Sequence, residues 1–207
     1  MGPASLAMAQ FDANGRLPSK LAGVQVLVNG IAAPLVYVSA RQHAAILPFG
    51  LSTARDSEIV VTYNDVASNA LSVPSANTSP GIFSADMSGS GQGAIQNSDG
   101  KYNSPDNPAA PGSIIVLYLS GLGPLLPAQP DGTIVPASPL PALQYPVEVT
   151  IGGQRAGIVY QGPAPEQVAG LYQVNCIIPL QTAPGPAAVQ VTAGGRTSQP
   201  NVTVTVK

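Results

Sequence analysis

The chain has 207 residues, a formal net charge of −2, and charged residues at 9% of the total, against about a quarter in an average soluble protein. Its 8 Lys and Arg residues against 10 Asp and Glu residues provide no excess of positive charge for binding phosphates, so we expect no nucleic-acid partner. Its 22 Gly and 22 Pro interrupt the sequence too often for helices of ordinary length, which predicts an all-β, loop-rich protein.

The N-terminal segment, Met1 to Gln10, carries no basic region and no long apolar stretch. Ala7-Met8-Ala9 is similar to the small residues at the end of a signal peptide, but too little sequence precedes it for a working signal. No run approaches the roughly 20 apolar residues that cross a bilayer. We therefore expect neither a signal peptide nor a membrane span in this chain.

The first regular elements lie between residues 24 and 73. Val24 to Val28 alternates and stops at Asn29-Gly30, which is typical of a type I′ turn, and Leu35 to Val38 returns antiparallel. A third strand, Gln42 to Leu47, contains His43, the only histidine. A closing hairpin follows, with Glu58 to Tyr63 and Val66 to Val73 joined by Asn64-Asp65.

A connector rich in Gly, Ser, Asn and Pro follows, over residues 77–111. The segments Gly93 to Gln96 and Lys101 to Ser104 flank an Asp99-Gly100 turn, so we expect a small hairpin in it. The prolines at 105, 108 and 111 then stiffen the chain before the next strand, Ser113 to Leu119.

The segment from Val147 to Leu180 repeats Val24 to Phe49 in outline. Two offsets, 123 residues and then 131 after an insertion over 162–170, align Val24 with Val147, Tyr37 with Tyr160, Gln42 with Gln173 and Pro48 with Pro179. The second copy uses Gly152-Gly153 and Gly194-Gly195 where the first uses Asn29-Gly30 and Asn64-Asp65. The sequence therefore predicts two β-sandwiches in tandem, 1–76 and 112–207, separated by the connector 77–111.

A strand, a Gly-Gly turn, a strand, a strand ending in Ile-Pro and a closing hairpin together resemble the IPT/TIG type of immunoglobulin-like domain in both copies. Further segments resemble an uncharacterised C-terminal domain of Acidobacteria of the Solibacter type. They are Ser79-Pro80-Gly81-Ile82-Phe83, Gly91-Gln92-Gly93-Ala94-Ile95, Asn103-Ser104-Pro105, Asn107-Pro108-Ala109, Leu122-Gly123-Pro124 and Val168 to Asn175. The resemblance implies tandem immunoglobulin-like sandwiches at the end of a larger exported protein, an extracellular or cell-surface location, and no catalytic residues to carry over.

The two copies differ at their starts. Copy two opens with the strand Ser113 to Leu119 before Gly123-Pro124, whereas copy one begins at Gly2-Pro3, so we expect the first sandwich to lack its first strand. This would leave a sheet edge uncovered. Three readings remain open: a longer parent chain that supplies the strand, a donor strand from another subunit, and an edge capped by Ala4 to Gln10.

No group of residues in the sequence points to catalysis or to a cofactor. A Ser-His-Asp triad could draw only on His43, which we expect at a partly buried or edge position, and the unpaired Cys176 is expected to be a core thiol. His43 and Cys176 together provide too few ligands for zinc. The loop Gly89 to Gly93 lacks the phosphate-binding spacing. Six acidic and amide residues could offer oxygens to calcium but do not follow the EF-hand pattern: Asp86, Asp99, Asp106, Asn97, Asn103 and Asn107.

The sequence thus favours a non-enzymatic extracellular module that acts as a spacer or a protein-contact domain. One alternative is a carbohydrate-binding module, for which Tyr102, Tyr145 and Tyr172 are the candidate ligand-facing aromatics, although the chain has no Trp. For the equivalent Tyr37 and Tyr160, repetition in both copies favours a shared packing role over a sugar-stacking one. A second alternative is a strand-accepting subunit of an extracellular filament, with a strand donor as the partner of the first module.

Overall fold

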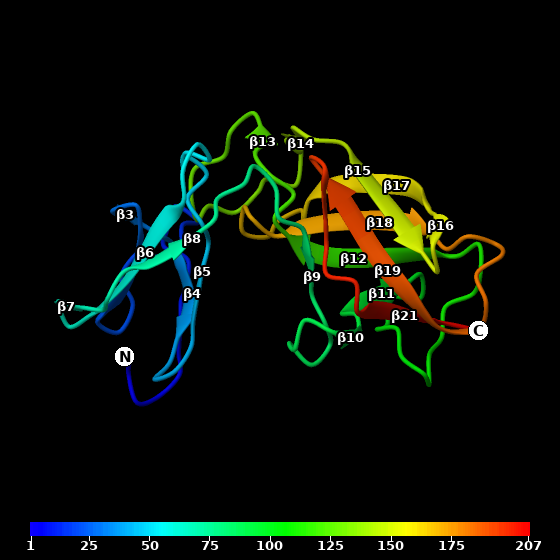
Figure 1. Cartoon of the computed structure of the whole chain (residues 1–207), viewed down its shortest axis with the longest axis horizontal. Coiled ribbons are helices and arrows are strands. Elements are labelled where there is room, and N and C mark those ends of the chain that lie inside the picture. Colours follow the sequence, from blue (N-terminus) through cyan, green and yellow to red (C-terminus); the bar gives the residue numbers. More distant parts are fainter. The chain divides into compact units, whose positions relative to one another are not determined.

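The computed structural model describes all 207 residues and contains strands and turns but no helix. No segment therefore forms a helix long and apolar enough to cross a membrane. The chain divides into two compact units (Figure 1). Unit 1 comprises residues 1–77, 128–137 and 166–170, and unit 2 comprises residues 78–127, 138–165 and 171–207.

Unit 1 contains two antiparallel sheets. One has the order β1-β4-β5 and the other β3-β2-β6-β7, with β8 also paired to β6. The strands are β1 (Ala7–Met8), β2 (Val24–Val28), β3 (Ile31–Ala32), β4 (Leu35–Val38), β5 (His43–Ala45), β6 (Ser57–Tyr63), β7 (Val66–Ala67) and β8 (Leu71–Val73).

Unit 2 is a larger sandwich of two main sheets, with orders β10-β21-β19-β15-β16 and β11-β12-β18-β17. All of its strand pairs are antiparallel except β10 with β21. The first strands are β9 (Gly81–Ile82), β10 (Gly91–Gln92), β11 (Ile95–Asn97), β12 (Ile114–Ser120), β13 (Leu125–Leu126), β14 (Ala142–Leu143) and β15 (Val147–Ile151). The others are β16 (Gln154–Arg155), β17 (Gly157–Pro163), β18 (Tyr172–Ile177), β19 (Gly185–Ala193), β20 (Arg196–Thr197) and β21 (Val202–Val206).

The sequence repeat is a structural repeat as well. In the second strand of each hairpin the register shifts at the same place, between Leu35 and Tyr37 in β4 and between Ile158 and Tyr160 in β17. Near the end of each copy a serine hydroxyl accepts the backbone N–H of a central-strand valine: Ser68 from Val61 at 3.1 Å, and Ser198 from Val191 at 3.0 Å. The same register shift and the same serine hydrogen bond thus occur at equivalent positions of both copies.

The composition of residues 77–111 predicts a connector between two sandwiches, but residues 78–111 belong to unit 2. Its strand β11 pairs with β12, and the expected hairpin forms around Asp99-Gly100. Buried Asn103 joins this hairpin to β21: its amide nitrogen donates to the Thr205 carbonyl at 2.9 Å, and its amide oxygen accepts the Thr205 N–H at 2.7 Å. Because these polar groups hydrogen-bond to one another, the connector can pack against the core without leaving buried donors or acceptors unpaired.

The predicted second domain, 112–207, is also interrupted, because residues 128–137 and 166–170 belong to unit 1. Leu17 donates its N–H to Gly132, and Ile134 donates to Gly15, each through the backbone. Ala169 in turn donates to Thr133. Neither segment shows strand alternation, so the sequence does not indicate the sheet-like contacts that they make in unit 1.

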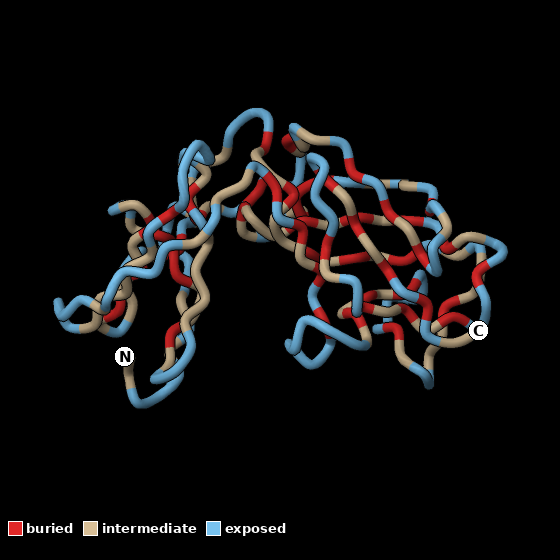
Figure 2. The backbone as a smooth tube through the Cα atoms, in the orientation of Figure 1, coloured by how far each residue is buried: buried red, intermediate tan, exposed pale blue.

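The cores of the two units differ in size. Unit 1 has a small core of six buried residues, Val24, Val26, Val28, Ala33, Leu35 and Val38. Unit 2 has a much larger one, in which buried residues alternate along β12, β15, β18, β19 and β21 (Figure 2). Residues of β6 that correspond to fully buried valines of β19 are only partly buried, so the first sandwich is incomplete.

Candidate functional site

The incomplete side of unit 1 lies at β5. In unit 2 the equivalent strand β18 is central, with β12 on one side and β17 on the other. In unit 1, β5 pairs with β4 alone and is the end of its sheet. The expected absence of a first strand is thus confirmed in the pairing: no strand occupies the position that β12 fills in unit 2.

The N-terminal segment caps a different edge. Ala7 and Met8 pair with Val38 and Tyr37 of β4, on the side of β4 that faces away from β5. The reading in which Ala4 to Gln10 covers the exposed edge is therefore correct for β4 but wrong for β5. We call the uncovered side of residues His43 to Leu47 the β5 edge.

Backbone geometry shows which polar groups point out from this edge. Ile46 donates its N–H to the Pro34 carbonyl at 2.8 Å, and the Gln42 carbonyl accepts the Ser39 N–H at 2.9 Å, so both groups point toward β4. Backbone groups alternate in direction along a strand. The N–H and C=O groups of His43 and Ala45 therefore point away from β4, where no strand receives them.

The equivalent groups in unit 2 are paired. Ile178 donates its N–H to the Ser113 carbonyl at 3.0 Å and accepts the Gly112 N–H at 2.8 Å, which begins the β12–β18 ladder. Leu47 aligns with Ile178, and its N–H and C=O make no backbone hydrogen bond. The edge thus lacks the same bonds that the second copy makes.

Apolar side chains beside the edge are uncovered too. Leu47 is 59% exposed, whereas the aligned Ile178 is 0% exposed. Leu71 is also 59% exposed; it lies directly opposite Ile59 in the β6–β8 pair and so shares the face on which Ile59 packs against the core. We call Leu47, Leu71 and the partly buried Ile59, Val61 and Tyr63 the open core face.

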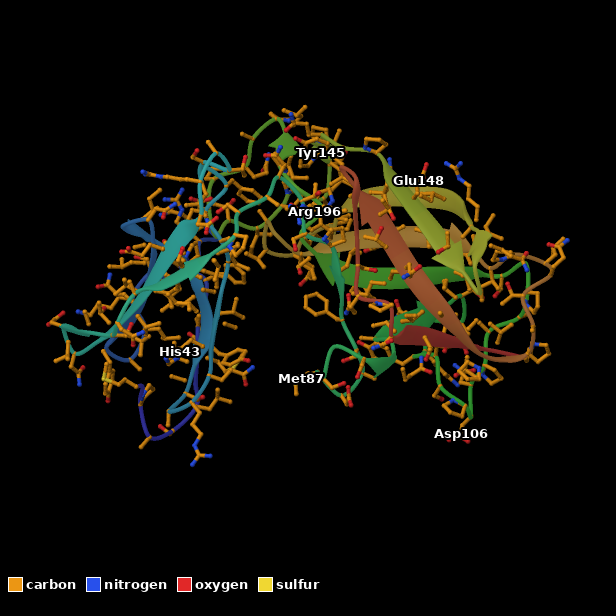
Figure 3. All side chains as sticks on the ribbon, viewed as in Figure 1. His43, Met87, Asp106, Tyr145, Glu148 and Arg196 are labelled. Atoms are coloured by element: carbon orange, nitrogen blue, oxygen red, sulfur yellow. The ribbon has the colours of Figure 1, made fainter.

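His43 lies at this edge, half-buried, as expected from the sequence (Figure 3). Its Nε2 lies 2.9 Å from the carbonyl oxygen of Met1, and its Nδ1 is shielded from water without a hydrogen-bond partner. The Met1 carbonyl is the hydrogen-bond partner of the imidazole, and no serine or carboxylate side chain bonds to it.

The candidate aromatics do not form a common platform. Tyr102 is 67% exposed, in the hairpin that follows β11, and Tyr145 is half-buried between β14 and β15. Tyr172 is wrong as a ligand-facing residue: it is 2% exposed, its hydroxyl donates to the Gly123 carbonyl, and burial raises its pKa to about 12. The alternation of β18 directs its ring into the core.

The equivalent tyrosines Tyr37 and Tyr160 are both half-buried on their strands. The Tyr160 hydroxyl donates to the Pro163 carbonyl at 2.6 Å, and partial burial raises its pKa. This engagement of the hydroxyl fits the packing role that the repeat favours.

Three of the residues considered for metal binding form hydrogen bonds with other side chains of the chain. Asp86 accepts hydrogen bonds from Ser88 and Ser84, in that order of effect, and these lower its pKa. Asn97 and Asn103 bond to each other at 3.1 Å within the connector. No group of three or more His, Cys, Asp or Glu side chains is placed to hold a metal ion.

Cys176 is a core thiol, as expected, and burial raises its pKa to about 12. An open hollow of about 370 Å³ lies elsewhere in unit 2, lined in part by Val147, Ala156 and Ile158. The exposed Arg155 and Glu148 pair across 3.0 Å at this hollow and so neutralise each other.

The β5 edge and the open core face are therefore the features of the molecule best suited to bind another molecule. The sequence indicates them through the unequal starts of the two copies, whereas nothing in it indicates that Leu71 stays exposed. Comparison of the chain with protein-family models and with curated proteins finds no match.

Proposed function

We propose that the chain is a non-catalytic, immunoglobulin-like protein-contact module of a larger extracellular protein. The observation that carries this proposal is the β5 edge beside the open core face: unpaired backbone groups next to large exposed aliphatic side chains. Exposed apolar surface of this kind marks interaction sites in stable proteins. The extracellular location rests on the resemblance to the Solibacter-type C-terminal domain and to IPT/TIG modules.

Unit 2 supports a spacer role alongside the contact role. Its buried core and its internally hydrogen-bonded amide network form a closed scaffold. In this proposal unit 2 is the spacer, and the open sandwich of unit 1 carries the contact surface.

A carbohydrate-binding role has less support. Sugar recognition requires several exposed aromatic rings on one face, and of the three candidates only Tyr102 is largely exposed. Retention of the chain on insoluble polysaccharide, abolished by Tyr102→Ala, would favour this alternative over the proposal.

The proposal is tested by site-specific photo-crosslinking in the cells that produce the protein. A photoreactive residue at position 47 or 71 should give discrete protein adducts. The control position is Leu180, an aliphatic residue of unit 2 that is 72% exposed and lies in the turn after β18. Adducts at 47 and 71 but not at 180 support a contact function, whereas equal labelling at all three positions, or none, contradicts it.

A further inference from the structure

Resting on the proposed function, we propose that the partner contact is a single added β-strand. An extended peptide segment runs antiparallel to β5, bonds to the outward groups of His43, Ala45 and Leu47, and turns alternate apolar side chains into the open core face. Strand addition to an exposed sheet edge is a recognised mode of peptide binding, in which main-chain bonds provide affinity and alternate side chains provide specificity.

The second copy supplies the geometry of this strand. In unit 2, β12 pairs antiparallel with β18, placing Ile115 opposite Cys176, Leu117 opposite Val174 and Leu119 opposite Tyr172. The aligned residues of copy one are Ala45, His43 and Arg41. A strand in the same register would place alternate side chains opposite Ala45 and His43 of β5, and its next alternate side chain would lie beside the turn between β4 and β5 that carries Arg41.

The replacements in copy one define the chemistry of the incoming side chains. Ala45 is smaller than Cys176, and Leu47 beside it is uncovered. The positions opposite Ala45 and His43 therefore accept large aliphatic side chains. Arg41 is exposed and forms no ion pair, and it stands where copy two has buried Tyr172. Because Arg41 lies in the turn just before β5, a carboxylate two residues beyond the position opposite His43 would meet its guanidinium. The partner segment is therefore an extended strand with two aliphatic residues two apart, followed two residues later by an acidic one.

A second copy of β5 is a poorer occupant. Pairing β5 with itself would bring Ala45 and His43 to the open core face, and these side chains are too small or too polar to cover Leu47 and Leu71. A helix is poorer still, because its own backbone bonds leave no donors or acceptors for the β5 edge.

The first test uses the full chain and a fluorescent peptide that copies Ser113 to Ser120, with Glu in place of Leu119 to meet Arg41. Fluorescence anisotropy should show saturable binding. In β12 the Leu117 N–H shares the side of the strand that faces β18, whereas the Tyr118 carbonyl faces the other way and accepts the Phe83 N–H. N-methylation at the Leu117 position should weaken binding about tenfold or more, since it removes one ladder bond and adds bulk between the strands. N-methylation at the Tyr118 position should leave affinity nearly unchanged.

The matched protein variant is Ala45→Pro. The Ala45 N–H points away from β4, so proline leaves the β4–β5 bonds in place while it removes an outward donor, as prolines on edge strands do. Binding should fall about tenfold or more while the thermal unfolding of the chain stays close to that of the unaltered protein. A charge reversal provides a second arm: Arg41→Glu should weaken the acidic peptide and favour a peptide with Lys at that position.

Absence of saturable binding, or equal effects of the two N-methylations, would overturn strand addition. If crosslinks at positions 47 and 71 nevertheless form, the contact function stands and only its mode is wrong. If the peptide binds in the expected pattern but no crosslinks form, the edge accepts a strand while the proposed function fails. A dimer of the chain alone that is lost on Ala45→Pro would replace the partner strand with a second copy.

Discussion

At the scale of single residues, two glycines with positive φ distinguish the cost of a left-handed backbone conformation from the cost of a steric clash at an added Cβ atom. Gly121 has φ of +75°, and a Cβ added there would lie 1.9 Å from the Ser79 carbonyl oxygen. Gly195 has nearly the same φ, +78°, with nothing within 4 Å of the added Cβ. Because both positions carry the same conformational cost, the pair isolates the cost of the clash between two backbone segments of unit 2.

We expect Gly195→Ala to lower the free energy of unfolding of unit 2 by about 1 kcal/mol, from the left-handed backbone alone. Gly121→Ala should cost about 3 kcal/mol or more, because neither the carbonyl nor the added methyl group can move away. Urea denaturation followed by circular dichroism measures both. Equal losses in the two variants would mean that the Ser79 segment shifts freely, contrary to its bond to the Gly121 carbonyl.

At the scale of elements, the two copies provide the same hydrogen bond in two environments. Ser68 and Ser198 each accept a valine N–H from the adjacent strand and donate their own N–H to the same valine's carbonyl. Ser198 is buried, whereas Ser68 is only half-buried. Removal of the hydroxyl therefore leaves a dry, unpaired donor in unit 2 and a donor that water can reach in unit 1.

Ser198→Ala should cost about 2 kcal/mol, the penalty for an unsatisfied buried N–H, while Ser68→Ala should cost about 0.5 kcal/mol. Hydrogen exchange at the Val191 and Val61 amides measures each effect at its own strand. A larger loss in Ser68→Ala than in Ser198→Ala would show that burial does not set the value of this bond.

The hairpins were the most predictable elements, and the reason is local. A type I′ turn requires positive φ at both central residues. Asn29-Gly30 has φ values of 52° and 78°, and Gly152-Gly153 has 57° and 77°. Asn64-Asp65 and Gly194-Gly195 repeat the pattern. Residue types that tolerate this conformation occur where the turns form, so the sequence specifies these hairpins without reference to the rest of the chain.

Long-range assignments were less predictable. The sequence predicts the absence of a strand beside β5 only because a second copy is present for comparison. It does not predict that residues 128–137 and 166–170 join unit 1, since their bonds to Leu17 and Gly15 connect positions far apart in the chain. It also misplaces Tyr172 at the surface, although Tyr172 alternates with the polar Gln173 and Asn175 and shares the buried face of β18 with Cys176.

At the scale of the whole molecule, unequal cores predict unequal stabilities. Burial of one aliphatic side chain contributes about 1.5–3 kcal/mol, and unit 1 leaves Leu47 and Leu71 uncovered where unit 2 buries Ile178 and Val202. We expect unit 1 to open at a lower temperature and a lower urea concentration than unit 2. Amides of β6 should therefore exchange with solvent faster than those of the equivalent strand β19.

Cys176 reports on unit 2 alone. It is the single cysteine, it is buried, and burial raises its pKa to about 12, so a thiol reagent at pH 8 meets neither an accessible nor an ionised group until unit 2 unfolds. In a heating series we expect a first loss of β-sheet signal without labelling of Cys176 and a second loss with labelling. The acidic β12-like peptide should raise the first transition and leave the second unchanged, because it binds only unit 1. A single transition coincident with labelling, or a peptide effect on the labelling step, would show that the open sandwich is as stable as the closed one.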